Sequence, residues 1–376
     1  MKIQRKLPED HRPYTDKYFL RTKQILEAEG INPVTSMKVF ARGGGEVAGL
    51  DEAIEALTEF TDLERTGEIW VTKKPTFQNK DPLIVIKGPI QNYVELETMY
   101  LGILSTAISA AAGIALPNPE NIEEKVRRLA GIYGNIPITY FGARHYHWSL
   151  DKEIAAAALR GRAVQTSTDI GSANISKSGV GTTPHVLTLA LASVYGRDQA
   201  TLKTTELFDK YMPGDIPRMT LVDTFNKELA DSLAVAQYFG DRRNLIRLDT
   251  CGENIGEGCS LYQGRKEKDP TYQTGTGVTL ELVRNIRNNL IENGYGDSTD
   301  IFLTSGFGNE DKARIFAEAN EDFKEKTCYD LFIGVGVGEV SEARFCTADV
   351  FEIDGKQMYK TGRETTVDYS QLRRVV

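Results

Sequence analysis

The alternation of short apolar runs with helical patterns in the second half of the chain is the feature that most constrains its fold. Six such runs occur in about 200 residues: IPITYF (136–141), RAVQT (162–166), RMTLVD (218–223), LIRLD (245–249), DIFLTS (300–305) and YDLFIG (329–334). Strands that take turns with helices predict a parallel sheet with helical crossovers, as an open doubly wound sheet or as a barrel.

Polar residues of the kinds that carry chemistry recur at or just past the ends of these runs. They are Arg144, Asp223, Asp249, Ser305 and Gly334. Because the site of an α/β barrel is built at the carboxyl ends of its strands, this recurrence favours a barrel over an open sheet.

The first third of the chain predicts a different, mixed α/β unit. Its patterns indicate helices over 16–29, 50–60 and 92–112, with strands around Met37, over 68–73 and over 83–87. The pair Asn118-Pro119 then predicts a helix start. The last 30 residues alternate again. We therefore predict an N-terminal domain over 1–117, joined by 345–376, and a barrel domain over 118–344.

Composition excludes several classes of protein. The 376 residues include 53 acidic and 45 basic side chains, so the formal net charge of −8 argues against nucleic-acid binding. The longest weakly polar stretch, 101–116, is too short for a bilayer span, and no apolar leader opens the sequence. The four cysteines show no C-x-x-C pair. We expect a cytoplasmic protein with reduced thiols and no membrane contact.

Glycine is in excess, with 34 residues against about 26 for average usage. Two clusters follow the last two predicted strands, Ser305-Gly306-Phe307-Gly308 and Gly334-Val335-Gly336-Val337-Gly338. Backbone N–H groups in such loops make the usual phosphate cradle of an α/β barrel. Tight strand-to-helix turns are one alternative. A dinucleotide fingerprint, which would indicate an NAD(P)-dependent oxidoreductase, is another.

Charged residues at predicted strand ends and at a helix start are of the kinds that bind or transfer phosphate groups. Asp223 and Asp249 end strands, and Arg247 precedes Asp249 by two residues. Such carboxylates hold Mg²⁺ or ribose hydroxyls, or they are solvent-facing helix caps. His185 falls in a first helical turn if Thr183 is the N-cap and Pro184 the first helical residue. An imidazole there could carry a phosphoryl group, although a surface histidine is the simpler interpretation.

Seven segments in order resemble the nicotinate phosphoribosyltransferase family. They are Tyr14-Thr15-Asp16-Lys17-Tyr18, Lys87-Gly88-Pro89 with Glu95-Leu96-Glu97-Thr98, Phe141-Gly142-Ala143-Arg144, Gly181-Thr182-Thr183-Pro184-His185, Leu221-Val222-Asp223-Thr224-Phe225, Arg247-Leu248-Asp249-Thr250, and the two glycine clusters. The resemblance implies an incomplete TIM-like α/β barrel with an N-terminal α/β sandwich domain that the C-terminal segment completes. It also implies a homodimer with shared active sites.

The activity implied is transfer of the 5-phosphoribosyl group of phosphoribosyl pyrophosphate to nicotinate, giving nicotinate mononucleotide and pyrophosphate. Mg²⁺ accompanies the phosphoribosyl pyrophosphate, and ATP acts as co-substrate by phosphorylating His185. The resemblance assigns catalytic roles to His185, Asp223, Arg247 and Asp249. It has Tyr18, from the neighbouring subunit, and Phe141 cover the two faces of the pyridine ring. The full substrate-binding set is Asp16, Tyr18, Phe141, Arg144, His147, Thr182, Ser305, Gly306, Gly308, Gly334, Gly336 and Gly338.

Departures from the family pattern leave the substrate open. Arg144 is followed by His145 where many relatives have a second arginine. Relatives that use nicotinamide place an aspartate against the amide, and Thr168-Asp169 or Ser172-Ala173-Asn174 could match that position. The alternatives are therefore a nicotinamide or quinolinate phosphoribosyltransferase, or a nucleotide-binding relative without activity. The pair His145 and His147 could also hold a metal. Because the chain has only two further histidines, this is the weaker interpretation.

Overall fold

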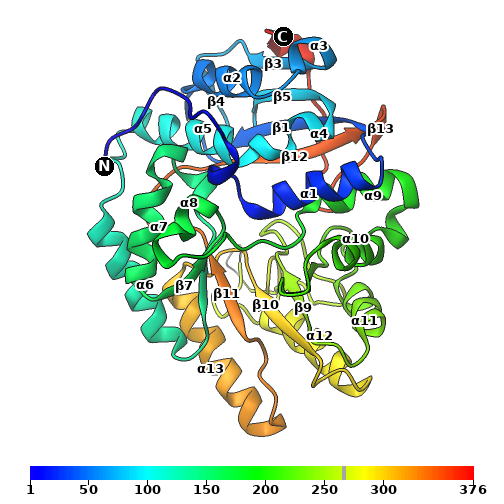
Figure 1. Cartoon of the computed structure of the whole chain (residues 1–376). Coiled ribbons are helices and arrows are strands. Elements are labelled where there is room, and N and C mark those ends of the chain that lie inside the picture. The colour runs from blue at the N-terminus through cyan, green and yellow to red at the C-terminus, as the bar shows by residue number, and fades with distance from the viewer. Residues whose placement is uncertain (265–267) are drawn as a thin grey trace.

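The computed structural model describes residues 1–264 and 268–376, and it divides the chain between two six-stranded sheets, one above the other in Figure 1. The parallel sheet has the order β7-β6-β11-β10-β9-β8. Its strands are β6 (Ile138–Tyr140), β7 (Ala163–Thr166), β8 (Met219–Leu221), β9 (Asn244–Leu248), β10 (Thr299–Leu303) and β11 (Gly334–Val337). Because β7 and β8 are the edges of this sheet, the described strands form an incomplete barrel, as predicted.

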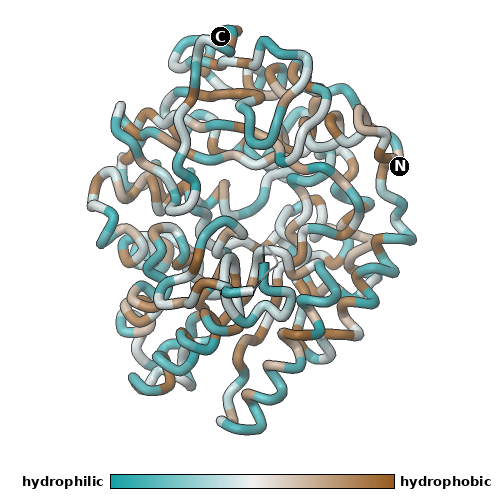
Figure 2. Tube along the Cα trace, turned by 180° about the vertical axis from the view of Figure 1, so that it is seen from behind, coloured by the Kyte–Doolittle hydropathy of each residue, from teal (hydrophilic) through white to brown (hydrophobic). Residues whose placement is uncertain are grey.

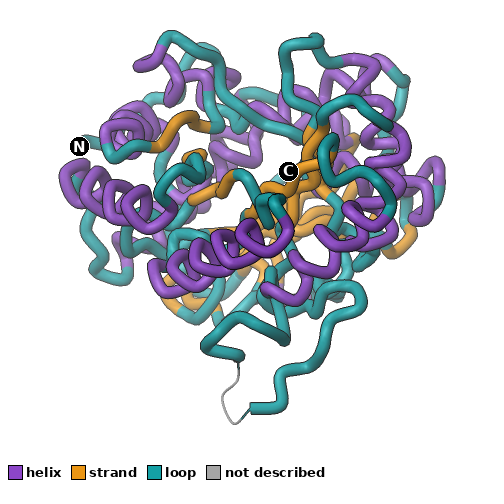
Figure 3. The backbone as a smooth tube through the Cα atoms, turned by 90° about the horizontal axis from the view of Figure 1, so that it is seen from below, coloured by secondary structure: helices purple, strands orange, loops and turns teal. Residues whose placement is uncertain are grey.

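Helices surround the parallel sheet, as the view from below shows (Figure 3). The helices of this part of the chain are α6 (Pro119–Tyr133), α7 (Asp151–Arg160), α8 (Asp169–Ser172), α9 (His185–Tyr195), α10 (Arg197–Tyr211), α11 (Glu228–Phe239), α12 (Leu280–Glu292) and α13 (Glu310–Thr327), of which α9 packs toward the upper sheet. Local signals begin several of them. The Asn118 side chain accepts from the Glu120 N–H at 2.8 Å, and Asn309 accepts from the Lys312 N–H at 2.9 Å.

The upper sheet is antiparallel and combines strands from both ends of the chain, in the order β13-β12-β1-β5-β3-β14. Its strands are β1 (Val34–Ala41), β3 (Glu68–Thr72), β5 (Pro82–Pro89), β12 (Cys346–Ile353), β13 (Lys356–Gln357) and β14 (Leu372–Arg374). The strand β12 pairs with β1, and β14 pairs with β3. The C-terminal segment therefore completes the sheet of the first third of the chain.

The remaining elements of the first third cover this sheet. They are α1 (Lys17–Ala28), α2 (Leu50–Glu59), α3 (Leu63–Thr66), α4 (Ile90–Tyr93) and α5 (Glu97–Ala111), with a small ribbon of β2 (Gly45–Glu46) and β4 (Thr76–Phe77). Short 3₁₀ turns are η1 (Arg12–Tyr14), η2 (Val94–Leu96), η3 (Ala143–His145), η4 (Trp148–Leu150), η5 (Ala173–Ile175) and η6 (Tyr369–Gln371). No described helix is long and apolar enough to cross a bilayer, and the four cysteines are free thiols.

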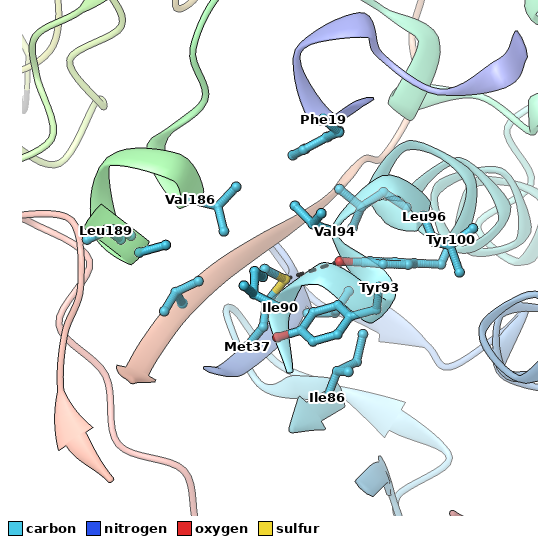
Figure 4. Close-up of a cluster of buried hydrophobic side chains, with 14 of the residues drawn as sticks. Phe19, Met37, Ile86, Ile90, Tyr93, Val94, Leu96, Tyr100, Val186 and Leu189 are labelled. Atoms are coloured by element: carbon cyan, nitrogen blue, oxygen red, sulfur yellow. Dashed lines mark hydrogen bonds between the residues drawn. The ribbon is translucent and has the colours of Figure 1, made fainter. Parts of the chain in front are cut away.

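Each sheet has its own hydrophobic core, and hydrophilic segments lie mostly at the periphery (Figure 2). The helix α9 follows the edge strand β7 in the chain, yet its apolar residues belong to the core of the upper sheet. Figure 4 shows Val186 and Leu189 beside Met37 and Phe19 in that core. The Tyr100 hydroxyl donates to the Met37 sulfur at 3.2 Å there. Since α9 packs upward, its first residue, His185, lies between the two halves.

Two local predictions were wrong. The last strand begins at Gly334 rather than 329, because Leu331 and Phe332 are buried without being in the strand and the pairing with β10 begins at Gly334. Thr183 does not cap α9: its hydroxyl accepts from the Leu221 N–H at 3.2 Å, and Pro184 is the N-cap. The helix α7 begins directly after the turn η4, whose N-cap is the His147 side chain.

Candidate active site

A cavity of about 940 Å³ lies between the two sheets, at the carboxyl ends of the parallel strands. The upper half contributes Tyr18, Glu97 and residues of β12, and the lower half contributes the loops after β6, β9, β10 and β11. In this architecture the carboxyl ends of the strands are where ligands bind. The cavity is therefore the candidate active site.

A guanidinium group lies next to each of two aromatic rings in the cavity. The Arg247 carbon Cζ lies 5.6 Å from the centre of the Phe141 ring, and Arg144 Cζ lies 5.7 Å from that of Tyr18. Gly336 makes room for Phe141, because a Cβ there would approach the ring carbon Cδ2 to 2.4 Å. Flat rings next to cations suit a flat, anionic ligand. Tyr18 lines the cavity of its own chain.

Arg144 keeps its charge available because its acidic neighbour is mostly neutral at pH 7. The Glu97 oxygen Oε1 lies 3.8 Å from Arg144 Nη1. Burial raises the pKa of Glu97 to about 8, and the attraction of Arg144 only partly opposes this. A protonated Glu97 does not cancel the arginine's positive charge. Arg144 can therefore pair with the carboxylate of a ligand.

His185 belongs to a buried charged cluster that includes a residue from the far end of the chain. Its Nε2 lies 3.1 Å from Asp223 Oδ1 and 2.8 Å from Lys360 Nζ. Lys360 also donates to Asp223 Oδ2 and, at 3.1 Å, to the Asp249 carbonyl oxygen. We call His185, Asp223 and Lys360 the histidine cluster.

The pKa values in the histidine cluster follow from this arrangement. Burial alone would raise the pKa of Asp223, but Lys360 and His185 outweigh it and hold that pKa well below its usual range. Burial and the positive charge of Lys360 lower the pKa of His185, which Asp223 only partly offsets. Burial would lower the pKa of Lys360, but Asp223 and Asp249 raise it. At neutral pH the cluster is an ion pair beside a neutral imidazole.

Asp249 is the carboxylate that faces the cavity. It pairs with Arg247 Nη2 at 3.2 Å and accepts from the Thr304 hydroxyl at 2.8 Å, with a quarter of its side chain exposed. Asp223, by contrast, is completely buried, with one oxygen in contact with His185 and the other in contact with Lys360. Asp249 can therefore bind a cation or a hydroxyl, whereas Asp223 does not fit as a metal ligand. The described residues contain no group of three or more metal-binding side chains.

The two glycine clusters lie against each other at one end of the cavity. A Cβ on Gly308 would approach the Glu339 carbonyl oxygen to 2.6 Å, so only glycine allows this contact. Ser305 and Gly306 both have positive φ, 78° and 80°, which turns the chain sharply before α13. The loop 305–309 thus presents backbone groups at the start of a helix, as a phosphate site does.

The structure brings most, but not all, of the predicted site residues to the cavity. Those that line it are Tyr18, Phe141, Arg144, His185, Arg247, Asp249, Ser305, Gly306, Gly308, Gly336 and Gly338. Asp223 lies behind His185. Asp16 and Thr182 are buried outside the lining, and no described residue hydrogen-bonds to the carboxylate of Asp16 or the hydroxyl of Thr182. Gly334 is buried in β11, where a Cβ would meet Phe302.

His147 and His145 do not act together. His147 is buried outside the cavity lining, with Nε2 2.7 Å from Glu52 Oε1 and Nδ1 2.8 Å from the Ser149 hydroxyl. His145 does line the cavity, and its Nδ1 donates to the Gly338 carbonyl oxygen at 3.1 Å. Burial lowers the pKa of His145 to about 4, so this ring is neutral.

The interpretation of the second glycine cluster as a dinucleotide fingerprint is also wrong. Gly334 and Gly336 lie within β11 rather than in a strand-to-helix turn, and the next described element is the strand β12. A fingerprint of this kind must open a helix whose N-terminus holds the pyrophosphate. The alternative of an NAD(P)-dependent oxidoreductase loses its sequence support.

Three basic residues of the cavity were not predicted from the sequence: Lys360, Arg363 and Lys312. Lys360 has no local signal, because its partners His185 and Asp249 lie 175 and 111 residues away. Lys312 has a weak one. It is a lysine in the first turn of α13, where the helix dipole disfavours a cation.

Comparisons with known proteins place the fold. Residues 16–108, about a quarter of the chain, match the family model described as quinolinate phosphoribosyl transferase, N-terminal domain. The structure of nicotinate phosphoribosyltransferase from Vibrio cholerae is 13% identical, with a TM-score of 0.65, over 93% of this chain and 87% of that chain. The enzyme of the same name from Porphyromonas gingivalis is 13% identical, with a TM-score of 0.60, over 93% of this chain and 92% of that chain.

A nicotinate-nucleotide pyrophosphorylase from Pyrococcus furiosus is 24% identical over 97% of this chain and 82% of that chain, but its TM-score of 0.45 is too low to add to the comparison of folds. The Vibrio and Porphyromonas structures confirm the predicted resemblance at the level of the fold.

Proposed function

We propose that this chain, which has the fold of the nicotinate phosphoribosyltransferases, transfers the 5-phosphoribosyl group of phosphoribosyl pyrophosphate to nicotinate. The observation that carries the proposal is the composition of the cavity between the two sheets. It combines two aromatic rings and an arginine free to bind a carboxylate with a glycine-rich loop at a helix start. The first pair suits a pyridine carboxylate, and the loop suits a sugar phosphate.

The residues have distinct roles in the proposed reaction. Phe141 and Tyr18 hold the pyridine ring, and Arg144 binds its carboxylate. Asp249 holds ribose hydroxyls or the Mg²⁺ that enters with phosphoribosyl pyrophosphate. When pyrophosphate leaves, positive charge develops at the sugar carbon that the ring nitrogen attacks. The enzyme then needs to position the reactants, stabilise the leaving charge and exclude water, and no protein nucleophile is required.

ATP coupling is a further part of the proposal. The neutral ring of His185 has a lone pair that can accept a phosphoryl group from ATP, with release of ADP. When the ring proton is on Nε2 and is donated to Asp223 Oδ1, the lone pair is on Nδ1, which hydrogen-bonds to no described residue and is available to the phosphoryl group. We also propose a cytoplasmic homodimer, which light scattering in solution can test.

The direct test is an assay of pyrophosphate release from phosphoribosyl pyrophosphate and Mg²⁺ with nicotinate, nicotinamide or quinolinate, each with and without ATP. Nicotinate should be the preferred acceptor. Arg144→Met should remove this preference, and Phe141→Ala should raise KM for the acceptor. Tyr238→Ala, a partly exposed ring on the outer helix α11, should leave both unchanged. Turnover of nicotinamide alone would refute the nicotinate assignment.

Quinolinate is the second candidate, because residues 16–108 match the model of a quinolinate phosphoribosyl transferase domain. Quinolinate carries two carboxylates, and the cavity lining contains further cations in Arg247 and Arg363. Release of carbon dioxide together with pyrophosphate would support it over nicotinate.

His185→Ala tests the ATP coupling separately. It should abolish stimulation by ATP while leaving slow, ATP-independent transfer. An unchanged ATP dependence would remove His185 from the coupling step without affecting the assignment of the transfer reaction.

A further inference from the structure

Lys312 is a buried lysine in the cavity that the proposed reaction does not yet use. It is the third residue of α13, and only 6% of it is exposed. Its Nζ donates to the Ser305 carbonyl oxygen at 2.9 Å and lies 4.2 Å from the centre of the Phe307 ring. The rings of Tyr272 and Phe316 lie 5.5 Å away.

The charge of Lys312 has no counter-ion among the residues that the structure describes. The adjacent acidic residues of α13 turn elsewhere: Glu310 pairs with Arg128 at 3.0 Å, and Asp311 pairs with Arg314 at 3.3 Å. The charged groups that act on Lys312 from other elements are Glu339, Asp249 and Lys268, and none of them forms an ion pair with it. A buried, unpaired ammonium group is unfavourable unless an anion joins it.

The position of Lys312 indicates which anion that is. Its ammonium group lies at the loop 305–309, where a Cβ on Gly306 would be 4.0 Å from Nζ. The same loop begins the 18-residue helix α13. The backbone groups, the helix dipole and the lysine therefore converge on one place in the cavity.

We propose that Lys312 supplies the positive charge for the phosphate group of the ligand at the loop 305–309, and that phosphate binding protonates this side chain. This inference rests on the proposed function for the identity of the ligand, and it adds a residue and a proton to it. Without ligand, burial lowers the pKa of Lys312 to about 7, so this side chain is neutral in most molecules above that pH. A bound dianion would favour the charged form.

A purely structural role is the competing interpretation. In it, Lys312 only clamps the Ser305 carbonyl and so holds the left-handed conformation of Ser305. Such a clamp takes up no proton when an anion binds. Proton uptake therefore separates the two roles.

The experiment is titration calorimetry with inorganic phosphate at about pH 8, in two buffers of different ionisation enthalpy. Sulfate, which does not titrate at this pH, serves as a second probe. The wild-type protein should take up close to one proton per bound anion. Lys312→Met should take up none and bind phosphate on the order of tenfold to a hundredfold more weakly. Lys312→Arg should bind phosphate without proton uptake, because arginine stays charged.

Lys324→Met is the matched control, since it removes a half-exposed lysine from the same helix. It should behave as the wild type. Thermal unfolding of each variant, with and without phosphate, shows that the variant is folded and whether phosphate still stabilises it.

Phosphate binding without proton uptake, or unchanged affinity in Lys312→Met, would overturn the inference. So would a wild-type protein that binds neither anion. The titration uses no acceptor and no ATP, so its outcome is independent of the transfer assay. A protein inactive in transfer that still takes up a proton through Lys312 would refute the proposed reaction but keep the role of Lys312.

Discussion

Two buried lysines line the same cavity, and their surroundings are opposite. Lys360 donates to the Asp223 carboxylate and to the Asp249 carbonyl oxygen, and the negative charges of Asp223 and Asp249 raise its pKa. Lys312 has one carbonyl acceptor and three aromatic rings, and burial lowers its pKa to about 7. The two lysines are similarly buried, with exposed fractions of 7% for Lys360 and 6% for Lys312, yet their pKa values shift in opposite directions.

The difference shows how the cavity divides its work. Around Lys360 the positive charge is already neutralised inside the protein, so this lysine positions Asp223 and the ring of His185. Around Lys312 the positive charge is not balanced by any described residue, so the phosphate group of a ligand serves as its counter-ion. A buried cation with satisfied donors is part of the fold, whereas one without a counter-ion marks a binding site.

The largest effect is expected from Lys360→Met. This change leaves the completely buried Asp223 without its counter-ion and should lower the free energy of unfolding by about 3–5 kcal/mol. Urea denaturation measures it. The double variant Lys360→Met/Asp223→Asn should recover most of the loss, because no buried charge then remains unpaired. A loss below about 1 kcal/mol in the single variant would break the comparison.

Lys312→Met should have the opposite sign. It replaces an unpaired buried amine with an apolar side chain of similar length, and should raise the unfolding free energy by about 1–3 kcal/mol at pH 7 without phosphate. The folded pKa of about 7 lies below the unfolded value. The unfolded state therefore binds more protons between about pH 7 and 10, and wild-type stability gains from this group as pH rises. The variant should lose that gain, and destabilisation would contradict this account.

The effect of Lys360→Met should shrink in acid. The pKa of Asp223 is lowered in the folded wild type, so the stability from the ion pair is present above the unfolded pKa of about 3.9 and is lost as pH falls through the folded value. The gap between wild type and variant should close by at most about 1.4 kcal/mol per pH unit. Denaturation at a series of pH values below about 4 measures it. A constant gap would show that packing, rather than charge, explains the loss.

Lys324→Met should have the smallest effect. Its partner Asp330 and the lysine itself are 36% and 52% exposed, and surface pairs of this kind contribute about 0–1 kcal/mol. A larger change on the outer face of α13 would mean that lysine substitutions in this helix act through the helix rather than through the cavity.

Much of the fold could be predicted from local patterns. The strands expected over 162–166 and 245–249 are within a residue of β7 and β9, because an apolar run bounded by turn residues records the strand directly. The last strand was displaced, since Leu331 and Phe332 are apolar for burial in a loop. The order of the seven segments along the chain likewise predicted the fold that this chain shares with the Vibrio and Porphyromonas structures.

The site was only partly predictable. Phe141, Arg144 and Asp249 follow strands and could be placed at the cavity from that position alone. His147 belonged to the predicted substrate-binding set, but its ring contacts Glu52 instead, because the side chain caps the turn η4 outside the cavity lining. Lys360 had no signal, since its partners come from distant elements.

By itself, the sequence determined the parallel sheet, the mixed α/β domain beside it and the glycine loops, because backbone period and turn chemistry are local properties. Only the tertiary structure decided that α9 packs upward, that Tyr18 lies in its own chain's cavity, and that Lys360 has a counter-ion while Lys312 has none among the described residues. Those outcomes depend on which distant groups meet in a low-dielectric interior, and no local pattern records that.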